Sequence, residues 1–320
     1  MDRKIYTTGE CILDVAFRGD EVLFLSPGGS KLNAAVSLGR AGMPVYMVSE
    51  CSDDPVGEFI RSFLQANHVS TEFISRFSGQ VRIAFAFLDA NNDAHYTFYR
   101  GFQQDSPEWK EPVFDHDDVL LFGSFYSLKA ENRARIIYLT DAARKGKSIL
   151  IYDPNFRKPH LSELNSVMPF ILENLRMADV IRGSDEDFGN IFRTVDPEGI
   201  YQQVNASGGK ILILTRGEKE IFLFTETIKR SYAVPAVRTV STIGAGDNFN
   251  AGLIFGMVRR GISRKDLQGL PVDEWDRLIG TAIAFATHVC GETSNYISPA
   301  FATRLLSGDM PIEQFNNLTI

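Results

Sequence analysis

The feature that most constrains the fold is a regular alternation of short apolar runs with helix-like segments. Four runs are rich in leucine and β-branched residues and stop at Gly, Asp, Asn or Ser: 120–124 (LLFGS), 148–155 (SILIYDPN), 178–184 (ADVIRGS) and 210–217 (KILILTRG). Such near-continuous runs are typical of parallel strands that are covered on both faces. The pattern therefore predicts a doubly wound α/β sheet, in which ligands bind beyond the carboxyl ends of the strands.

Two segments interrupt this alternation. Residues 14–29 and 81–101 show no helical spacing, and the second has alternating apolar positions on both sides of the turn signal NND. We expect a small antiparallel β-sheet that projects from the α/β body as a lid or a dimer contact. This reading divides the chain into a core of residues 1–13, 26–80 and 102–320 and a lid of residues 14–25 and 81–101.

The composition excludes several classes of protein. The chain has 320 residues, of which 44% are apolar, and a formal net charge of -7 without any basic block. Nucleic acid and anionic membranes are therefore not expected as partners. The three cysteines are far apart, so neither a disulfide framework nor a zinc site is expected. Because no apolar run has the length of a signal peptide or a membrane span, we expect a cytoplasmic protein.

The segment 241–252 (STIGAGDNFNAG) places small residues directly before an aspartate where a helical pattern begins. Gly244, Ala245 and Gly246 allow backbone N–H groups to approach an anion at a helix N-terminus. Asp247 beside such a site fits a general base that accepts a proton from an attacking hydroxyl group. The alternative is that Asp247 only caps the helix and that the glycines form a turn. A P-loop site is not expected, because no GxxxxGK[ST] motif is present.

The same segment resembles the C-terminal signature DTxGAGDxFxAG of the ribokinase-like carbohydrate kinases, the PfkB family. The family's N-terminal signature is similar to GGSKLNAAVSLGRAG here, with Gly28, Gly29 and Asn33. GECILD, FYRG, YDPNFR, SDED, TRGEKE and AIAFATHVCGE also occur in the family's order, so the resemblance covers essentially the whole chain.

The resemblance implies a ribokinase-like fold and assigns a role to individual residues. Asp247 matches the catalytic base, and Gly244, Ala245 and Gly246 match the anion hole for the transferred phosphoryl group. The positions implied to bind the substrate are Asp14, Gly28, Gly29, Asn33, Arg100, Asp153 and Arg157. The positions implied to lie beside the nucleotide are Ser184, Thr215, Gly217, Gly244, Gly246 and His288, and Asp187 matches the acidic residue that organises Mg²⁺.

Structural alternatives stay open for some of these residues. Asp14 could simply end the first strand, Asp153 and Arg157 could pair with each other to brace a turn, and Arg100 could be a surface charge. His288 lies in an apolar helical segment, which favours a packing residue over a nucleotide ligand.

The chain also departs from the family pattern. Ser241 and Ile243 replace an Asp and a Thr of a loop that helps to bind K⁺ in some relatives, so K⁺ dependence is left open. Ser30 replaces a lysine that could meet a substrate phosphate, although Lys31 is adjacent.

The function implied by the resemblance is ATP-dependent and Mg²⁺-dependent phosphorylation of a primary hydroxyl of a free sugar, with fructose as the first candidate. The alternative is a 2-keto-3-deoxygluconate kinase, in which Arg100 and Arg157 would bind the sugar-acid carboxylate. A third possibility is a sugar-binding homologue that has lost catalysis. We also expect a homodimer that forms through the lid.

Overall fold

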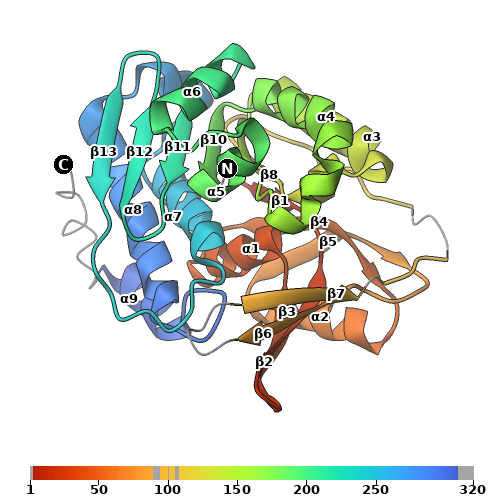
Figure 1. Ribbon diagram of the computed structural model, residues 1–320. Helices are drawn as coiled ribbons and strands as arrows, with labels where there is room; N and C mark the ends of the chain where they lie inside the picture. Colours follow the sequence, from red (N-terminus) through yellow and green to blue (C-terminus); the bar gives the residue numbers. More distant parts are fainter. Residues whose placement is uncertain (1–2, 89–93, 100, 105–107, 309–320) are drawn as a thin grey trace.

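The computed structural model describes residues 3–88, 94–99, 101–104 and 108–308. A nine-stranded sheet with the order β13-β12-β11-β10-β9-β8-β1-β4-β5 forms its centre, and a four-stranded sheet projects from one end (Figure 1). All neighbouring strands from β11 to β5 are parallel, whereas β12 and β13 add an antiparallel edge. This architecture confirms the expected doubly wound, mostly parallel sheet.

The strands and helices follow one another along the chain as the apolar runs predict. The strands of the central sheet are β1 (Ile5–Thr8), β4 (Val45–Ser52), β5 (Val69–Phe77), β8 (Val119–Gly123), β9 (Ile149–Asp153), β10 (Val180–Ser184), β11 (Leu212–Thr215), β12 (Glu220–Phe224) and β13 (Lys229–Ala233). The α-helices are α1 (Ser30–Arg40), α2 (Pro55–Ala66), α3 (Arg133–Lys145), α4 (Leu164–Met177), α5 (Asp185–Phe192), α6 (Pro197–Ala206), α7 (Ala245–Arg259), α8 (Val272–Cys290) and α9 (Pro299–Ser307). Short 3₁₀ helices are η1 (Phe125–Leu128), η2 (Ala130–Asn132), η3 (Lys158–Glu163) and η4 (Arg264–Gly269).

Successive residues of the central strands contribute to two separate apolar cores. In β8, Val119 and Leu121 belong to the core beneath α1, α2, α7, α8 and α9, while Leu120 and Phe122 belong to the core beneath α3 to α6. This alternation follows from the two-residue period of a strand. Since both faces of the sheet are covered, the strands are apolar almost throughout.

The projecting small sheet consists of β2 (Ile12–Arg18), β3 (Glu21–Gly28), β6 (Ile83–Leu88) and β7 (Ala94–Tyr99), in the order β3-β2-β6-β7. Two antiparallel hairpins, β2–β3 and β6–β7, are joined by a parallel pairing of β2 with β6. The first hairpin extends beyond the expected segment 14–25, because its ladder runs from Ile12 opposite Gly28.

One sequence-based expectation about this region is wrong. Asp14 does not end the first core strand: β1 ends at Thr8, residues 9–11 separate it from β2, and Asp14 is the third residue of β2. A strand of the small sheet therefore carries this carboxylate. The NND turn and Arg100 lie outside the described residues.

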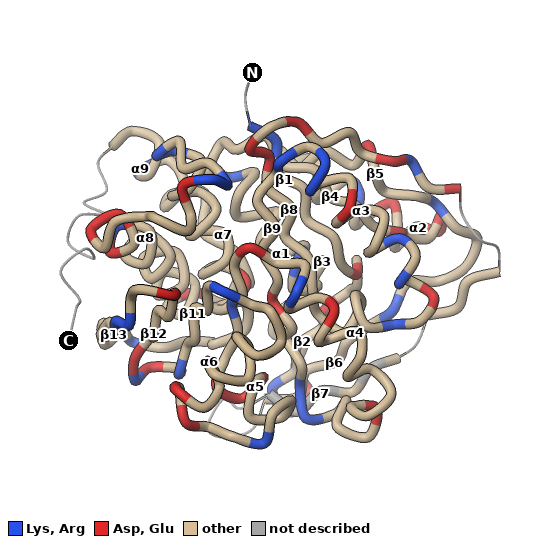
Figure 2. Tube along the Cα trace, turned by 90° about the horizontal axis from the view of Figure 1, so that it is seen from above, with Lys and Arg blue, Asp and Glu red and all other residues tan. Residues whose placement is uncertain are grey.

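Charged residues of both signs are interspersed over most of the trace (Figure 2). All three cysteines are free thiols, and Cys11 and Cys51 are buried. Within the described part of the chain, no helix combines the length and the apolar character needed to cross a membrane.

Candidate active site

The start of α7 lies at the carboxyl edge of the central sheet and offers unpaired N–H groups. Gly244 precedes the helix with a left-handed backbone, φ 80°, and a Cβ there would lie 2.6 Å from the carbonyl oxygen of Asn295. The Ala245 N–H donates to the Thr242 carbonyl oxygen over 3.2 Å. Among the described residues, no group accepts a hydrogen bond from the N–H of Gly246 or Asp247. These two N–H groups are thus available to an anion.

The Asp247 carboxylate is held from the first turn of another helix. Ser30 donates its hydroxyl to Asp247 Oδ1 over 2.6 Å, and Asn33 donates its amide to Asp247 Oδ2 over 2.9 Å. Both residues belong to α1, and Gly244 rather than Asp247 occupies the N-cap position of α7. The helix-capping alternative for Asp247 is therefore not what the structure shows. Burial raises the pKa of Asp247, and the charge of Lys31 and the two hydrogen bonds offset that rise in part.

Gly28 and Gly29 allow Asp14 to approach the start of α1. A Cβ on Gly28 would lie 1.9 Å from Asp14 Oδ2, and a Cβ on Gly29 would lie 2.3 Å from the Glu10 carbonyl oxygen. Gly29 also has a φ of 119°, which side chains other than that of glycine rarely adopt. No larger residue fits at either position, so the pair of glycines in the N-terminal signature has a structural reason in this chain.

Asp14 itself is half-buried, and Asn295 donates its amide to Asp14 Oδ2 over 3.2 Å. Burial, together with the nearby charge of Asp247, raises the pKa of Asp14 to about 7. The buried Asn33 Oδ1 has no hydrogen-bond partner among the described residues. An unsatisfied acceptor beside two carboxylates is suited to the hydroxyl groups of a polyol.

A buried network of charges lies below the anion-binding loop. Asp153, at the end of β9, accepts hydrogen bonds from Arg182 Nη1 at 3.2 Å and Asn250 Nδ2 at 2.5 Å, and Lys31 Nζ lies 3.8 Å away. Burial opposes ionisation of Asp153, but the charges of Lys31 and Arg182 hold its pKa below the ordinary value. Arg182 also donates to Thr215 Oγ1 over 2.9 Å, which connects the ends of three neighbouring strands.

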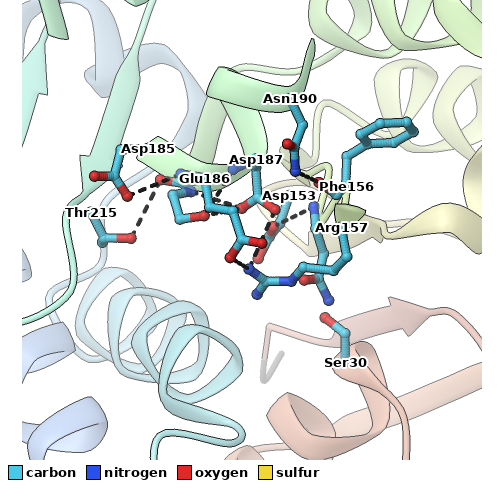
Figure 3. Close-up of polar contacts among 12 residues, drawn as sticks. Ser30, Asp153, Phe156, Arg157, Asp185, Glu186, Asp187, Asn190 and Thr215 are labelled. Atoms are coloured by element: carbon cyan, nitrogen blue, oxygen red, sulfur yellow. Dashed lines mark hydrogen bonds and ion pairs between the residues drawn. The ribbon is translucent and has the colours of Figure 1, made fainter. Parts of the chain in front are cut away.

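The suggested pairing of Asp153 with Arg157 does not occur as a direct contact. Arg157 Nη1 instead lies 3.0 Å from Glu186 Oε2 and 3.7 Å from Asp187 Oδ1 (Figure 3). The Arg157 side chain is 47% exposed, so it is accessible at the rim of the site.

Ser184 and Asp187 form the start of α5. Ser184 Oγ accepts a hydrogen bond from the Asp187 N–H, and Asp187 Oδ2 accepts one from the Ser184 N–H, which is a reciprocal capping box. This leaves Asp187 Oδ1 buried without a hydrogen-bond partner in the described part of the chain. That part also contains no group of three or more His, Cys, Asp or Glu side chains that could hold a metal ion.

His288 is occupied by contacts inside the protein. Its ring stacks on Phe301 with a centroid separation of 4.2 Å, and Nε2 lies 3.1 Å from both the hydroxyl and the backbone nitrogen of Ser298. These contacts fix the start of α9, as the packing alternative expects.

Gly217 lies two residues after the end of β11, is exposed and has a left-handed φ of 59°. A nucleotide contact at His288 or Gly217 stays a prediction.

Sequence reasoning overlooked several residues that complete the site. Arg182 is the important one, because a Cβ on Gly246 would lie 2.6 Å from its Nη1, so its guanidinium group lies directly against the anion-binding loop. The available signal was an arginine that directly follows the apolar pair Val180–Ile181 inside a strand-like run. Asn250 and Asn295 carry no comparable signal, since asparagine is common near helix and loop ends.

Comparisons with known proteins were made for the whole chain. Residues 5–289 match the profile of the pfkB family carbohydrate kinases. A fructokinase of Vibrio alginolyticus is 24% identical over 254 residues, which cover 78% of this chain and 83% of that protein. A 5-dehydro-2-deoxygluconokinase of Bacillus cereus is 25% identical over 281 residues, which cover 83% of this chain and 81% of that protein. A double mutant of a Vibrio cholerae fructokinase has been solved with fructose, ADP and a potassium ion. Its structure is similar to this one with a TM-score of 0.80 and a sequence identity of 18%, and the match covers 95% of this chain and 98% of that chain.

The fold and the profile together define a carbohydrate kinase, an enzyme that transfers a phosphoryl group to an alcohol. The chain belongs to the pfkB family of carbohydrate kinases.

The charge of Lys31 near Asp247 generates a prediction about pH dependence. Lys31 Nζ lies 3.0 Å from Ser30 Oγ, and the charge of Lys31 is the largest influence that lowers the pKa of Asp247. In Lys31→Met the pKa of Asp247 should rise, so the acid limb of the kcat/KM profile should move to higher pH, since a base must be deprotonated. The exposed Lys145→Met is the control for loss of one charge. An equal loss of activity at every pH would contradict this positioning role of Lys31.

The raised pKa of Asp14 generates a prediction about stability. Because the folded-state pKa of about 7 exceeds the ordinary value, Asp14 lowers the free energy of unfolding progressively as pH rises toward 7. Asp14→Asn should therefore be more stable than the wild type at pH ~8, on the order of a few kcal/mol, with the difference vanishing near pH ~4. Thermal unfolding across this range measures the effect. Asp20→Asn, an exposed residue of the same hairpin, should show no such trend.

Proposed function

We propose that the protein transfers the γ-phosphoryl group of ATP to a primary hydroxyl of a free sugar, with fructose as the first candidate. The observation that carries this proposal is the Asp247 carboxylate, held by Ser30 and Asn33 beside the unpaired N–H groups of Gly246 and Asp247. The sugar hydroxyl gives its proton to Asp247 as its oxygen attacks the γ-phosphorus, and the bond from that phosphorus to the bridging oxygen of ADP breaks, so that ADP leaves. The N–H groups stabilise the charge on the transferred group. The fructokinases among the relatives support fructose.

The sugar is held by the groups that surround Asp247. Asp14 and Asn33 supply a carboxyl group and a free amide oxygen, and Asn295 lies behind Asp14. With a pKa near 7, Asp14 can both donate to and accept from a hydroxyl group at neutral pH. Gly28 and Gly29 have no side chains that would occupy the space beside the Asp14 carboxyl group.

The nucleotide is assigned to the carboxyl ends of β10 and β11, where Ser184, Thr215 and Gly217 lie. Asp187 suits Mg²⁺, because its Oδ1 is a carboxylate oxygen without a hydrogen-bond partner among the described residues. When bound, Mg²⁺ neutralises the charge on the nucleotide phosphates. K⁺ dependence stays open: a neighbouring fructokinase structure holds potassium, but Ser241 lacks the carboxylate, and its hydroxyl accepts a hydrogen bond from the Ile243 N–H.

A second candidate substrate is a sugar acid. The half-exposed Arg157 offers a guanidinium fork at the rim of the site, and a carboxylate could replace its exposed partner Glu186. The similarity to a 5-dehydro-2-deoxygluconokinase supports this candidate. The reading as a binding protein without catalysis has no support in the geometry, because the base and the free N–H groups are both in place.

The cytoplasmic location expected from the sequence stays a prediction.

We also propose a homodimer that forms through the small sheet. In the strand register, Leu25 lies beside Val15, and Phe17 lies beside Phe87, so these side chains share one face. Leu25 is 52% exposed and Phe87 is 43% exposed, although Phe17 and Phe87 stack on each other. An apolar sheet face with this exposure is stabilised by a second copy of the same face.

The proposed reaction predicts a large loss of turnover in Asp247→Asn. The amide has the same shape but cannot accept the proton, so kcat should fall by at least about 10²-fold. A coupled assay of ADP release over hexoses, pentoses, sugar acids and nucleosides measures both turnover and specificity. Fast turnover of a keto-acid with fructose inert would replace fructose by the sugar acid. An Asn variant with nearly wild-type kcat would remove Asp247 from the mechanism.

The proposed dimer predicts a monomer when the shared face is charged. Phe87→Lys should shift the molar mass in size-exclusion chromatography with light scattering from two chains to one. Phe59→Lys is the matched control, because Phe59 is also exposed, at 44%, but lies on α2. A wild-type protein that elutes as a monomer at every concentration tested would contradict the dimer.

A further inference from the structure

A basic cavity lies at the edge of the central sheet opposite to Asp247. Its volume is about 680 Å³. Its lining residues lie in the segments that lead into strands β8 to β11, in the last turns of α3 and α4, or in η4. The start of α7 with Asp247 instead lies near the carboxyl ends of these strands, where Arg182 of β10 lies against Gly246. Strands of five residues separate the two edges by about 17 Å, so the cavity is not part of the kinase site.

The cavity carries a surplus of positive charge. Two aspartates line it, together with six lysine and arginine side chains, which are those of Arg144, Lys147, Arg176, Lys210, Arg264 and Lys265. This density is unusual in a chain with a formal net charge of -7. Cations gathered around a concave surface repel one another, and an anion relieves that repulsion.

The two aspartates of the cavity are already engaged. Asp179 Oδ1 accepts hydrogen bonds from Arg264 Nε and Nη2 at 3.0 and 2.9 Å. Asp117 Oδ1 accepts a hydrogen bond from the Arg264 backbone N–H at 3.1 Å, and its Oδ2 lies 2.6 Å from His116 Nδ1. Both carboxylates therefore anchor η4 through Arg264, and the charge of Arg144 also acts on Asp179.

Three cations of the cavity have no partner in the described part of the chain. The side chains of Lys147, Arg176 and Lys210 are exposed and make no hydrogen bond or ion pair with the described residues. Arg176 and Arg144 stand in the last turns of α4 and α3, where a cation compensates the helix dipole. Lys147 and Lys210 lie beyond the helix ends, so this structural reason does not account for them.

The backbone at Lys147 adds to this argument. Lys147 has a left-handed φ of 59°, a conformation in which Gly or Asn is favoured. The turn into β9 would therefore form more easily with glycine, as the turn into β11 does with Gly208, φ 97°. The backbone conformation therefore does not favour a lysine at this position.

We propose that this cavity binds a small phosphate-bearing anion. Ammonium and guanidinium groups that converge on a concave site match phosphate oxygens, and the volume is in the range of small-molecule sites. The shared chemistry is a phosphate or diphosphate group, which both nucleotides and sugar phosphates carry. The site is independent of the proposed kinase substrate, because it shares no residue with the kinase site.

Hydrogen-exchange mass spectrometry of the full chain tests this proposal, because it reports on both sites separately. The probes are pyrophosphate, ADP and fructose 6-phosphate, each at constant ionic strength. Wild-type protein should show protection of the backbone amides of residues 145–149 and 207–212, which border the cavity. Peptides that contain residues 242–250 report binding at the kinase site in the same experiment.

The variant Lys147→Gln/Lys210→Gln should weaken the protection at the cavity by about 10-fold or more and leave residues 242–250 unaffected. The control Lys145→Gln/Lys219→Gln removes two exposed lysines that do not line the cavity and should bind like the wild type. Stronger protection by ADP identifies a nucleotide site, and stronger protection by fructose 6-phosphate identifies a sugar-phosphate site. Absence of protection at the cavity with all three probes, or protection that persists in Lys147→Gln/Lys210→Gln, would overturn the proposal.

Discussion

The hydrogen bonds from Ser30 and Asn33 to the Asp247 carboxylate are the contact on which the rest of the site depends. They join the first turns of α1 and α7. Ser30 and Asp247 are 217 residues apart in the sequence, and Asn33 and Asp247 are 214 residues apart. Further along the same two helices, Ser37 Oγ donates to Asn248 Oδ1 over 2.5 Å and fixes their contact. The N-terminal ends of two helices thus meet at one carboxylate, and their dipoles add positive potential where a phosphoryl group would be transferred.

Three carboxylates occupy this region, and their surroundings give them different properties. Asp153 is paired with Arg182, Asn250 and Lys31, so its pKa is held below the ordinary value and it stays ionised. Asp14 has no cationic partner in the described part of the chain, and burial and the charge of Asp247 raise its pKa to about 7. Asp153 therefore remains a fixed negative charge, whereas Asp14 can donate a hydrogen bond near neutral pH. Burial also raises the pKa of Asp247, and the charge of Lys31 and the hydrogen bonds from Ser30 and Asn33 offset that rise in part.

The sequence predicted the elements well and their partners less well. The apolar runs located β8 to β11, because the signal of a buried strand is local. The two signature segments were expected at one site, and the structure brings them into contact. The role of Arg182 could not be read in the same way, because it depends on the adjacency of β9, β10 and β11, which strand composition does not encode. The displacement of Asp14 to β2 and the parallel pairing of β2 with β6 are likewise consequences of tertiary packing.

The glycines of the anion-binding loop have two reasons to be glycine. A glycine at a helix start lets a phosphate approach the backbone closely, and here contacts inside the protein also exclude larger side chains. The backbone of Asn295 occupies the space beside Gly244, and the guanidinium group of Arg182 occupies the space beside Gly246. Arg182 is in turn fixed by Asp153 and Thr215, at the ends of β9 and β11. Substitution of either glycine would therefore displace a cation or a backbone segment of the site, even before a ligand binds.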